Sequence, residues 1–208
     1  MGVAIDMPAG PSEVLIIADK TCNPSFVAAD LLSQAEHGAD SQVILLSDDS
    51  EVINEVNTEL AKQLEELPRK ELATQALKNS RAISLKSFDE CIEFSNEYAP
   101  EHLIIASESA SESVDKIVNA GSVFLGNYSC ESAGDYASGT NHTLPTNSFA
   151  RNYSGVSIDS FVKKITFQKL NKKGLENIGP AIEIMAEAEE LYAHKNAVTL
   201  RLNEIRNV

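Results

Sequence analysis

The chain has 208 residues, a formal net charge of −14 at pH 7 and a pI near 4.7. A chain of this length buries about 70% of the surface that its unfolded form exposes, so core size is no obstacle to a stable fold. The negative charge would repel nucleic acid and anionic membranes at long range. We therefore expect neither of these partners and favour a small, cationic ligand.

The cysteines and the N-terminal sequence indicate where in the cell the protein is located. Three cysteines, Cys22, Cys91 and Cys130, stand far apart in the sequence. An odd count without short spacing fits reduced thiols better than a disulfide framework. The chain shows no signal-peptide pattern and no run near the roughly 20 apolar residues of a spanning helix. The sequence therefore predicts a cytoplasmic protein.

Short apolar runs alternate with helical patterns along the first 126 residues. The runs predict buried strands at residues 13–18, 42–46, 82–85, 103–105 and 122–126. Helical spacing predicts helices at residues 24–37, 49–78 with a break near Pro68, 87–98 with Ser87 as N-cap, and 109–120. Because the strands are apolar throughout, they favour a Rossmann-like α/β fold, with a parallel sheet and helices on both faces. Ligands of such sheets bind at the carboxyl ends of the strands, where we expect the site.

The composition changes after Gly126. Residues 127–154 are rich in Ser, Gly, Asn, Thr and Tyr and predict a long functional loop without regular structure. Residues 162–170 predict a strand, 171–179 a turn-rich link and 180–207 one or two helices. We place the α/β domain in residues 1–150 and an extended C-terminal helical tail in residues 151–208. This tail must pack on its own domain or on a second subunit.

Histidine is the side chain that most clearly points to chemistry. The four copies, His37, His102, His142 and His194, all lie in glycine-rich, polar or acidic surroundings. Imidazole is the commonest metal ligand and titrates near neutral pH. The pattern predicts a metal or acid/base site assembled from distant segments.

Two pairs of residues are candidates for this site. Gln34 and His37 stand three apart on a predicted helix, so their side chains share a face. His37 alone is equally explained as a cation at a helix C-terminus or as a satisfied core histidine. Glu101 and His102 directly precede an apolar strand. They suit a general base beside a carboxylate, although an ordinary charged loop pair is the alternative.

Two further candidates come from later in the chain. Asp135 lies between Gly134 and Gly139, where tight backbone turns hold an acidic side chain, or where Asp is simply a turn former. His194 follows Glu189 on the last predicted helix and is otherwise a surface histidine. A Gln, two distant His and an Asp form a mixed nitrogen and oxygen donor set, which suits zinc with open positions.

Several of these motifs resemble the histidinol dehydrogenase family. The matching stretches include DLLSQAEHG at 30–38, PEHLI at 100–104, ESAGDYASGTNH at 131–142 and AHKNAV at 193–198, with further matches at 8–14 and 120–126. They run in the family's order over almost the whole chain and resemble the C-terminal half of a family member. The family oxidises L-histidinol through the aldehyde to L-histidine with two NAD, the last step of histidine biosynthesis, and uses one zinc per site.

The resemblance implies a role for each candidate residue. Glu101 and His102 would be the catalytic pair. The zinc ligands would be Gln34, His37, Asp135 and His194. Substrate contacts would come from these four ligands together with Ser12, His102 and Glu189. The family also implies a homodimer in which the C-terminal tail crosses to the partner and completes the partner's site.

Length sets this chain apart from the family. Family members are about twice as long, and this chain has no Gly-x-Gly-x-x-Gly after a strand, so its NAD-binding residues are unknown. We expect a zinc and histidinol site without rapid turnover by this chain alone. Two alternatives stay open. They are a binding fragment that needs a separate N-terminal half and a zinc hydrolase that uses Glu101 and His102 around a metal-bound water.

Overall fold

The computed structural model describes residues 7–8 and 10–207. Two compact units make up the chain, Met1–Val162 and Lys163–Val208, and each is described by itself. The first six residues of the α/β domain expected at 1–150, and Ala9 of the matching stretch 8–14, lie outside the described residues. No helix of the described residues is both long and apolar enough to cross a membrane.

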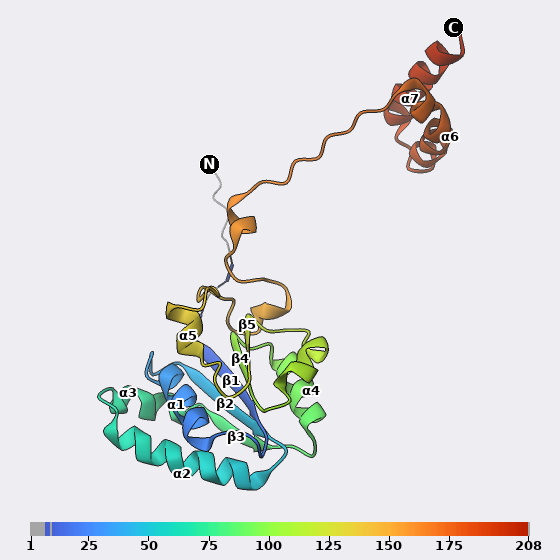
Figure 1. Cartoon of the computed structure of the whole chain (residues 1–208). Helices are drawn as coiled ribbons and strands as arrows, with labels where there is room; N and C mark the ends of the chain where they lie inside the picture. The colour runs from blue at the N-terminus through green and yellow to red at the C-terminus, as the bar shows by residue number, and fades with distance from the viewer. Residues whose placement is uncertain (1–6, 9, 208) are drawn as a thin grey trace. The chain divides into compact units, whose positions relative to one another are not determined.

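The first unit is built on a parallel sheet of five strands in the order β3-β2-β1-β4-β5, with helices on both faces (Figure 1). The predicted Rossmann-like α/β fold is confirmed. The strands are β1 (Glu13–Ala18), β2 (Gln42–Ser47), β3 (Arg81–Ser84), β4 (His102–Ala106) and β5 (Ser122–Leu125). The main helices of the unit are α1 (Pro24–Ala35), α2 (Ser50–Glu66), α3 (Lys70–Lys78) and α4 (Phe88–Tyr98).

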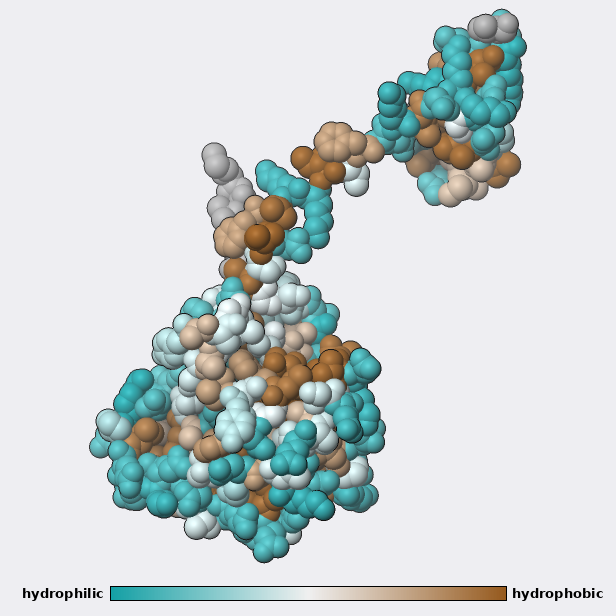
Figure 2. All heavy atoms as spheres, viewed as in Figure 1, coloured by the Kyte–Doolittle hydropathy of each residue, from teal (hydrophilic) through white to brown (hydrophobic). Residues whose placement is uncertain are grey.

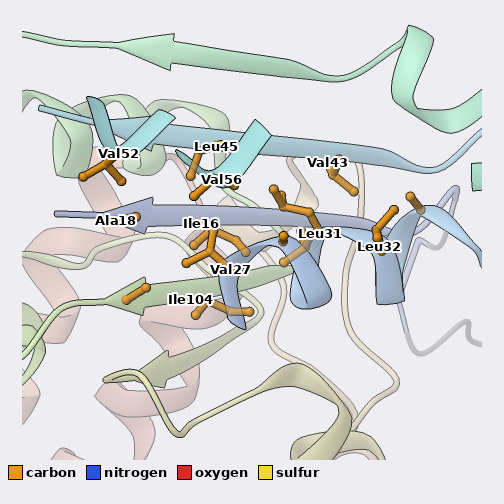
Figure 3. Close-up of a cluster of buried hydrophobic side chains, with 14 of the residues drawn as sticks. Ile16, Ala18, Val27, Leu31, Leu32, Val43, Leu45, Val52, Val56 and Ile104 are labelled. Atoms are coloured by element: carbon orange, nitrogen blue, oxygen red, sulfur yellow. The ribbon is translucent and has the colours of Figure 1, made fainter. Parts of the chain in front are cut away.

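The central strand β1 is apolar at nearly every position because helices cover both of its faces. Val14 and Ile16 point toward α1, α2 and α3, whose apolar residues fill the cluster drawn in Figure 3. Leu15 and Ile17 point to the opposite face, toward α4. Each such side chain contributes about 1.5–3 kcal/mol by leaving water.

Local signals placed most of these helices correctly. Asn23 caps α1, and Pro24 follows at its first position, where a missing N–H does no harm. Ser87 caps α4 as predicted, its Oγ accepting the Glu90 N–H at 3.2 Å. The helix closes on Ala99, whose φ of 56° is left-handed and turns the chain toward β4.

Two expectations for the second half of this unit were wrong. The helix predicted at 109–120 is a shorter 3₁₀ helix, Ala110–Lys116, in a segment whose Ser and Asp residues have low helix propensity. Residues 127–154 are not wholly irregular, since they contain α5 (Glu131–Tyr136) and the 3₁₀ turn Phe149–Arg151. A second 3₁₀ turn follows at Ile158–Phe161. The short α5 exists because it packs on β5, which local sequence does not reveal.

The second unit is a hairpin of α6 (Lys172–Ala188) and α7 (Tyr192–Arg206). The strand predicted at 162–170 and the link predicted at 171–179 were both wrong. Residues 162–170 are neither helix nor strand, because strand-forming side chains need a neighbouring strand to pair with. Helix α6 instead starts early, where Asn171 Oδ1 accepts the Gly174 N–H at 2.7 Å.

Close packing between α6 and α7 holds the hairpin together. A Cβ on Gly179 would lie 2.9 Å from two methyl carbons of Leu202, so only glycine allows this approach. Ala186 and Leu202 are buried, but many apolar side chains of the unit face outward, as Figure 2 shows. The most exposed of them are Ile165, Phe167, Ile184, Met185 and Tyr192.

Candidate functional site

The candidate residues of the first unit gather at the amino ends of the strands. His102 is the first residue of β4 and pairs with Val14 of β1. Helix α1 runs antiparallel to the strands it connects, so its C-terminal end, with Gln34, reaches the same edge. Our expectation of a site at the carboxyl ends was therefore wrong. The chain after β5 returns to the amino edge, where the Asn147 N–H donates to Glu13 Oε1.

The backbone of Glu13 holds both Glu101 and His102, the predicted catalytic pair. Its N–H donates to Glu101 Oε2 at 2.9 Å, and its carbonyl lies 3.2 Å from His102 Nδ1. Because a carbonyl only accepts hydrogen bonds, Nδ1 carries the ring proton and Nε2 has a free lone pair. This Nε2 is buried and has no hydrogen-bond partner among the residues that the structure describes.

Burial also sets the charge of the pair. Burial lowers the pKa of His102, so the ring is neutral near pH 7. Burial likewise raises the pKa of Glu101 to about 7, partly offset by the hydrogen bond from the Glu13 N–H. A neutral imidazole and a carboxyl that titrates near neutral pH are suited to accepting protons.

Helix α5 brings two carboxylates to the pair. Asp135 Oδ1 lies 4.0 Å from His102 Nε2, and Glu131 Oε1 lies 3.9 Å from His102 Nδ1. Gly134 makes this possible, since a Cβ there would lie 2.6 Å from a ring carbon of Phe124. The Phe124 ring in turn faces His102, with ring centroids 6.1 Å apart.

Sequence reasoning missed Glu131. Only 1% of this residue is exposed, and burial raises the pKa of its carboxyl to about 9. Its spacing of four from Asp135 would have placed both side chains on one helix face. We missed that signal because the segment was interpreted as an irregular loop.

Gln34 and His37 approach the pair from the end of α1. Gln34 is fully buried, and its side-chain amide lies against Glu131; with the amide nitrogen assigned to that side, it is 2.5 and 3.2 Å from the two Glu131 oxygens. His37 lies just beyond the helix, is exposed, and interacts electrostatically with His102, as does Asp135. Helices α1 and α5 thus present Gln34, His37 and Asp135 to the space beside the His102 ring.

This donor set fits zinc. An amide oxygen, an imidazole and a carboxylate are ligands that zinc accepts, and three protein ligands leave positions open for substrate or another residue. Within the described ranges, no group of three or more His, Cys, Asp or Glu side chains could hold a metal ion. The first unit contributes only two such side chains, His37 and Asp135, to the set. A full coordination sphere therefore needs the Gln34 amide and a donor from elsewhere.

Ser12 lies at a neighbouring hollow of about 200 Å³. The hollow is lined by residues from four segments, namely Pro11, Ser12, Glu13, Asp40, Gln42, Tyr98, Asn147 and Ser148. Burial raises the pKa of the Glu13 carboxyl, and the Tyr98 hydroxyl donates to Gln42 Oε1 at 2.7 Å. Ser12 is thus one residue from the Glu13 backbone that holds the catalytic pair.

Two predicted site residues lie in the second unit. Glu189 ends α6 and His194 lies in the first turn of α7, and both are exposed. The left-handed residue Glu190, with φ of 59°, forms the turn between them. The first unit does not supply these two contacts, and their role stays a prediction.

Together, the fold and the site define a Rossmann-like α/β protein with a buried acid–base pair beside a donor set suited to a metal. The family model described as Histidinol dehydrogenase matches residues 1–202. A histidinol dehydrogenase from Bacteroides thetaiotaomicron is 59% identical over 98% of this chain, and one from Escherichia coli O6:H1 is 57% identical over 99%. The chain belongs to the histidinol dehydrogenase family.

A solved structure agrees with this assignment. The crystal structure of histidinol dehydrogenase from Elizabethkingia anophelis is 69% identical in sequence and superposes with a TM-score of 0.96 over 99% of this chain. The match covers 47% of that protein, and 48% and 47% of the two relatives above. The chain thus spans about half the length of the relatives that it matches, corresponding to their C-terminal half.

Proposed function

We propose that this chain supplies the zinc- and histidinol-binding half of a histidinol dehydrogenase, which oxidises L-histidinol through the aldehyde to L-histidine with two NAD. The observation that carries the proposal is the His102 ring. The Glu13 carbonyl holds its Nδ1 beside Glu101, and its buried Nε2, which has no hydrogen-bond partner among the described residues, lies 4.0 Å from Asp135 Oδ1. Family membership identifies the alcohol on which such a base would act.

His102 and Glu101 divide the proton transfers between the two oxidations. His102 Nε2 takes the proton of the alcohol hydroxyl while a hydride leaves the carbinol carbon, which gives the aldehyde. Glu101 then takes a proton from a water that adds to the aldehyde, and His102 returns its proton to the aldehyde oxygen, which gives the diol. His102 next takes a hydroxyl proton from the diol while the second hydride leaves the carbon, which gives the acid. NAD, when bound, accepts each hydride.

Gln34, His37 and Asp135 would hold the zinc, together with His194. Zinc would bind the imidazole and amino nitrogens of histidinol and so fix the carbinol carbon beside His102. Ser12 and Glu189 would contact the substrate. The acidic chain also favours the approach of this cationic substrate, since opposite charges attract at long range.

The second unit would complete the site of a partner subunit. Its apolar surface, which includes Phe167 and Ile184, is exposed in a single chain, and burial of such a surface against another molecule would be favourable. Exchange of residues 151–208 between two copies would bury this surface and deliver Glu189 and His194 together. The exposure of Phe167, Ile184, Glu189 and His194 supports a homodimer.

NAD binding would need more than these residues. No dinucleotide fingerprint follows a strand, and the chain spans only 48% of the Bacteroides thetaiotaomicron relative. The three cysteines are free thiols, which is consistent with a cytoplasmic location.

Two measurements test this function. The first is calorimetric titration of the zinc-loaded protein with L-histidinol, with a chelator-stripped sample as the control. We expect binding only in the presence of zinc. Binding in neither sample would mean that the missing half is needed to shape the site and would refute a histidinol site within this chain.

The second measurement uses the N-terminal half of the Bacteroides thetaiotaomicron relative, added to this chain, with NADH production as the signal. We expect His102→Asn to slow histidinol oxidation by about 100-fold or more, the usual contribution of a general base. Glu101→Gln should slow oxidation of added histidinal far more than it slows the first step. Product formation without NAD would indicate a hydrolase instead.

A further inference from the structure

A buried carboxyl group that none of the predicted roles uses lies between the donor set and the predicted catalytic pair. Glu131 is 1% exposed and contacts Gln34 of α1 on one side and His102 of β4 on the other. Burying a carboxyl group is costly unless it is hydrogen-bonded, so the position demands an explanation.

The contact with Gln34 is directional. A glutamine amide has a nitrogen that only donates and an oxygen that only accepts, and only the oxygen can bind a metal cation. Assigned from its hydrogen-bonding surroundings, the amide nitrogen faces Glu131, lies 2.5 and 3.2 Å from its two oxygens, and donates to an unprotonated oxygen. The amide oxygen of Gln34 is thereby turned away from Glu131. Without this acceptor, either end of the amide could face the metal.

The same contact fixes the distance between two helices. Gln34 lies near the end of α1 and Glu131 at the start of α5, and each is followed within about one turn by a further donor, His37 or Asp135. A bond between Gln34 and Glu131 therefore also sets the spacing of His37 and Asp135.

We propose that Glu131 is a positioning residue that presents the amide oxygen of Gln34 to the zinc ion, a role that rests on the zinc site proposed above. Partners that orient metal ligands typically contribute about 10–100-fold to metal affinity. Glu131 acts through Gln34 and needs no contact with the metal or the substrate.

The test compares Glu131→Met with Glu131→Gln in the full 208-residue chain, with zinc affinity measured by calorimetry. Methionine keeps the length of the side chain but accepts no comparable hydrogen bond, so we expect about 10-fold weaker zinc binding or worse. Glutamine keeps an acceptor oxygen, so its affinity should stay within about threefold of wild type. Glu93→Met, on the exposed face of α4, is the matched control and should bind zinc like wild type.

Thermal unfolding of the metal-free proteins separates positioning from a structural role. Glu131→Met leaves the buried amide nitrogen of Gln34 without its acceptor, so its melting temperature should fall modestly while the variant stays folded at the titration temperature and its zinc affinity falls. Equal loss of affinity in the Met and Gln variants would mean that Glu131 acts through charge, and would overturn the proposal.

A second readout needs no metal. In the ¹⁵N–¹H spectrum, the side-chain amide of Gln34, assigned with Gln34→Met, should exchange slowly in wild type and in Glu131→Gln, but not in Glu131→Met. An unchanged amide signal and unchanged zinc affinity in Glu131→Met would overturn this proposal and leave the zinc site intact. Failure of wild type to bind zinc would instead overturn the proposed function, and the positioning role with it.

Discussion

Gly134 offers the sharpest test of how the fold positions the site. A Cβ at this position would lie 2.6 and 2.9 Å from two ring carbons of Phe124 and 2.9 Å from Thr140 Oγ1. Carbon contacts are most favourable at about 3.5–4.0 Å, so Gly134→Ala places the new methyl group about 1 Å too close. Either α5 or the Phe124 ring must move.

Both movements disturb the same site. Phe124 is 7% exposed and faces His102, and α5 carries Glu131 and Asp135. Overpacking of this kind costs about 1–3 kcal/mol, which corresponds to a melting temperature lower by about 2–10 °C. The sign of the change in stability is informative, because Gly→Ala inside an unconstrained helix is normally stabilising by about 0.5–1 kcal/mol.

Zinc calorimetry and thermal unfolding of Gly134→Ala measure the effect. We expect lower stability together with about 10-fold weaker zinc binding, since ligands are displaced by about 1 Å. Ser132→Ala, exposed on the same helix, is the control and should change neither property. Adding Phe124→Leu to Gly134→Ala should restore part of both losses. If Gly134→Ala matches Ser132→Ala in both measurements, α5 does not need this close contact and the reasoning is wrong.

Two further predictions concern stability. Burial raises the pKa of Asp30 to about 7, above its value of about 3.9 in the unfolded chain, so the folded state binds more protons between these values and wild-type stability falls as pH rises through them. The free energy of unfolding of Asp30→Asn should therefore exceed that of wild type by about 2 kcal/mol at pH 8. This is roughly half of the value that the full pKa shift gives, because solvent screens a half-buried group. In urea unfolding at pH 4 the difference should vanish. Ser87→Ala should cost about 1 kcal/mol by removing the cap of α4, whereas Ser87→Asp should cost little in the same assay. A pH-independent effect of Asp30→Asn, or equal losses in the two Ser87 variants, would contradict these arguments.

Most of the fold could be predicted because its signals are local. The run at 13–18 is apolar at successive positions, as a strand covered on both faces requires, and it forms β1 with the predicted bounds. Capping by Ser87 depends on residues three apart in the chain, so α4 was also found. The segment 162–170 misled us because its strand propensity has no neighbouring strand to satisfy it.

The candidate site was predicted only in part. Motifs directed attention to Gln34, His37, His102 and Asp135, and the fold brings these four toward one edge of the sheet. Glu131 was missed because its importance comes from contacts with residues about 30 and 100 positions away in the sequence. Glu189 and His194 belong to a separate unit, and their assembly with the site stays a prediction.

By itself, the sequence determined the secondary structure of the sheet and its main helices, the family, and the residue types available for chemistry. Only the tertiary structure decided at which edge of the sheet those residues meet and which nitrogen of His102 the Glu13 carbonyl holds. Local patterns report backbone conformation and burial, because these depend on neighbours within a few residues. Ring orientation, a buried carboxylate and the approach of α5 to Phe124 depend on pairs far apart in the chain, which become neighbours only when the fold is complete.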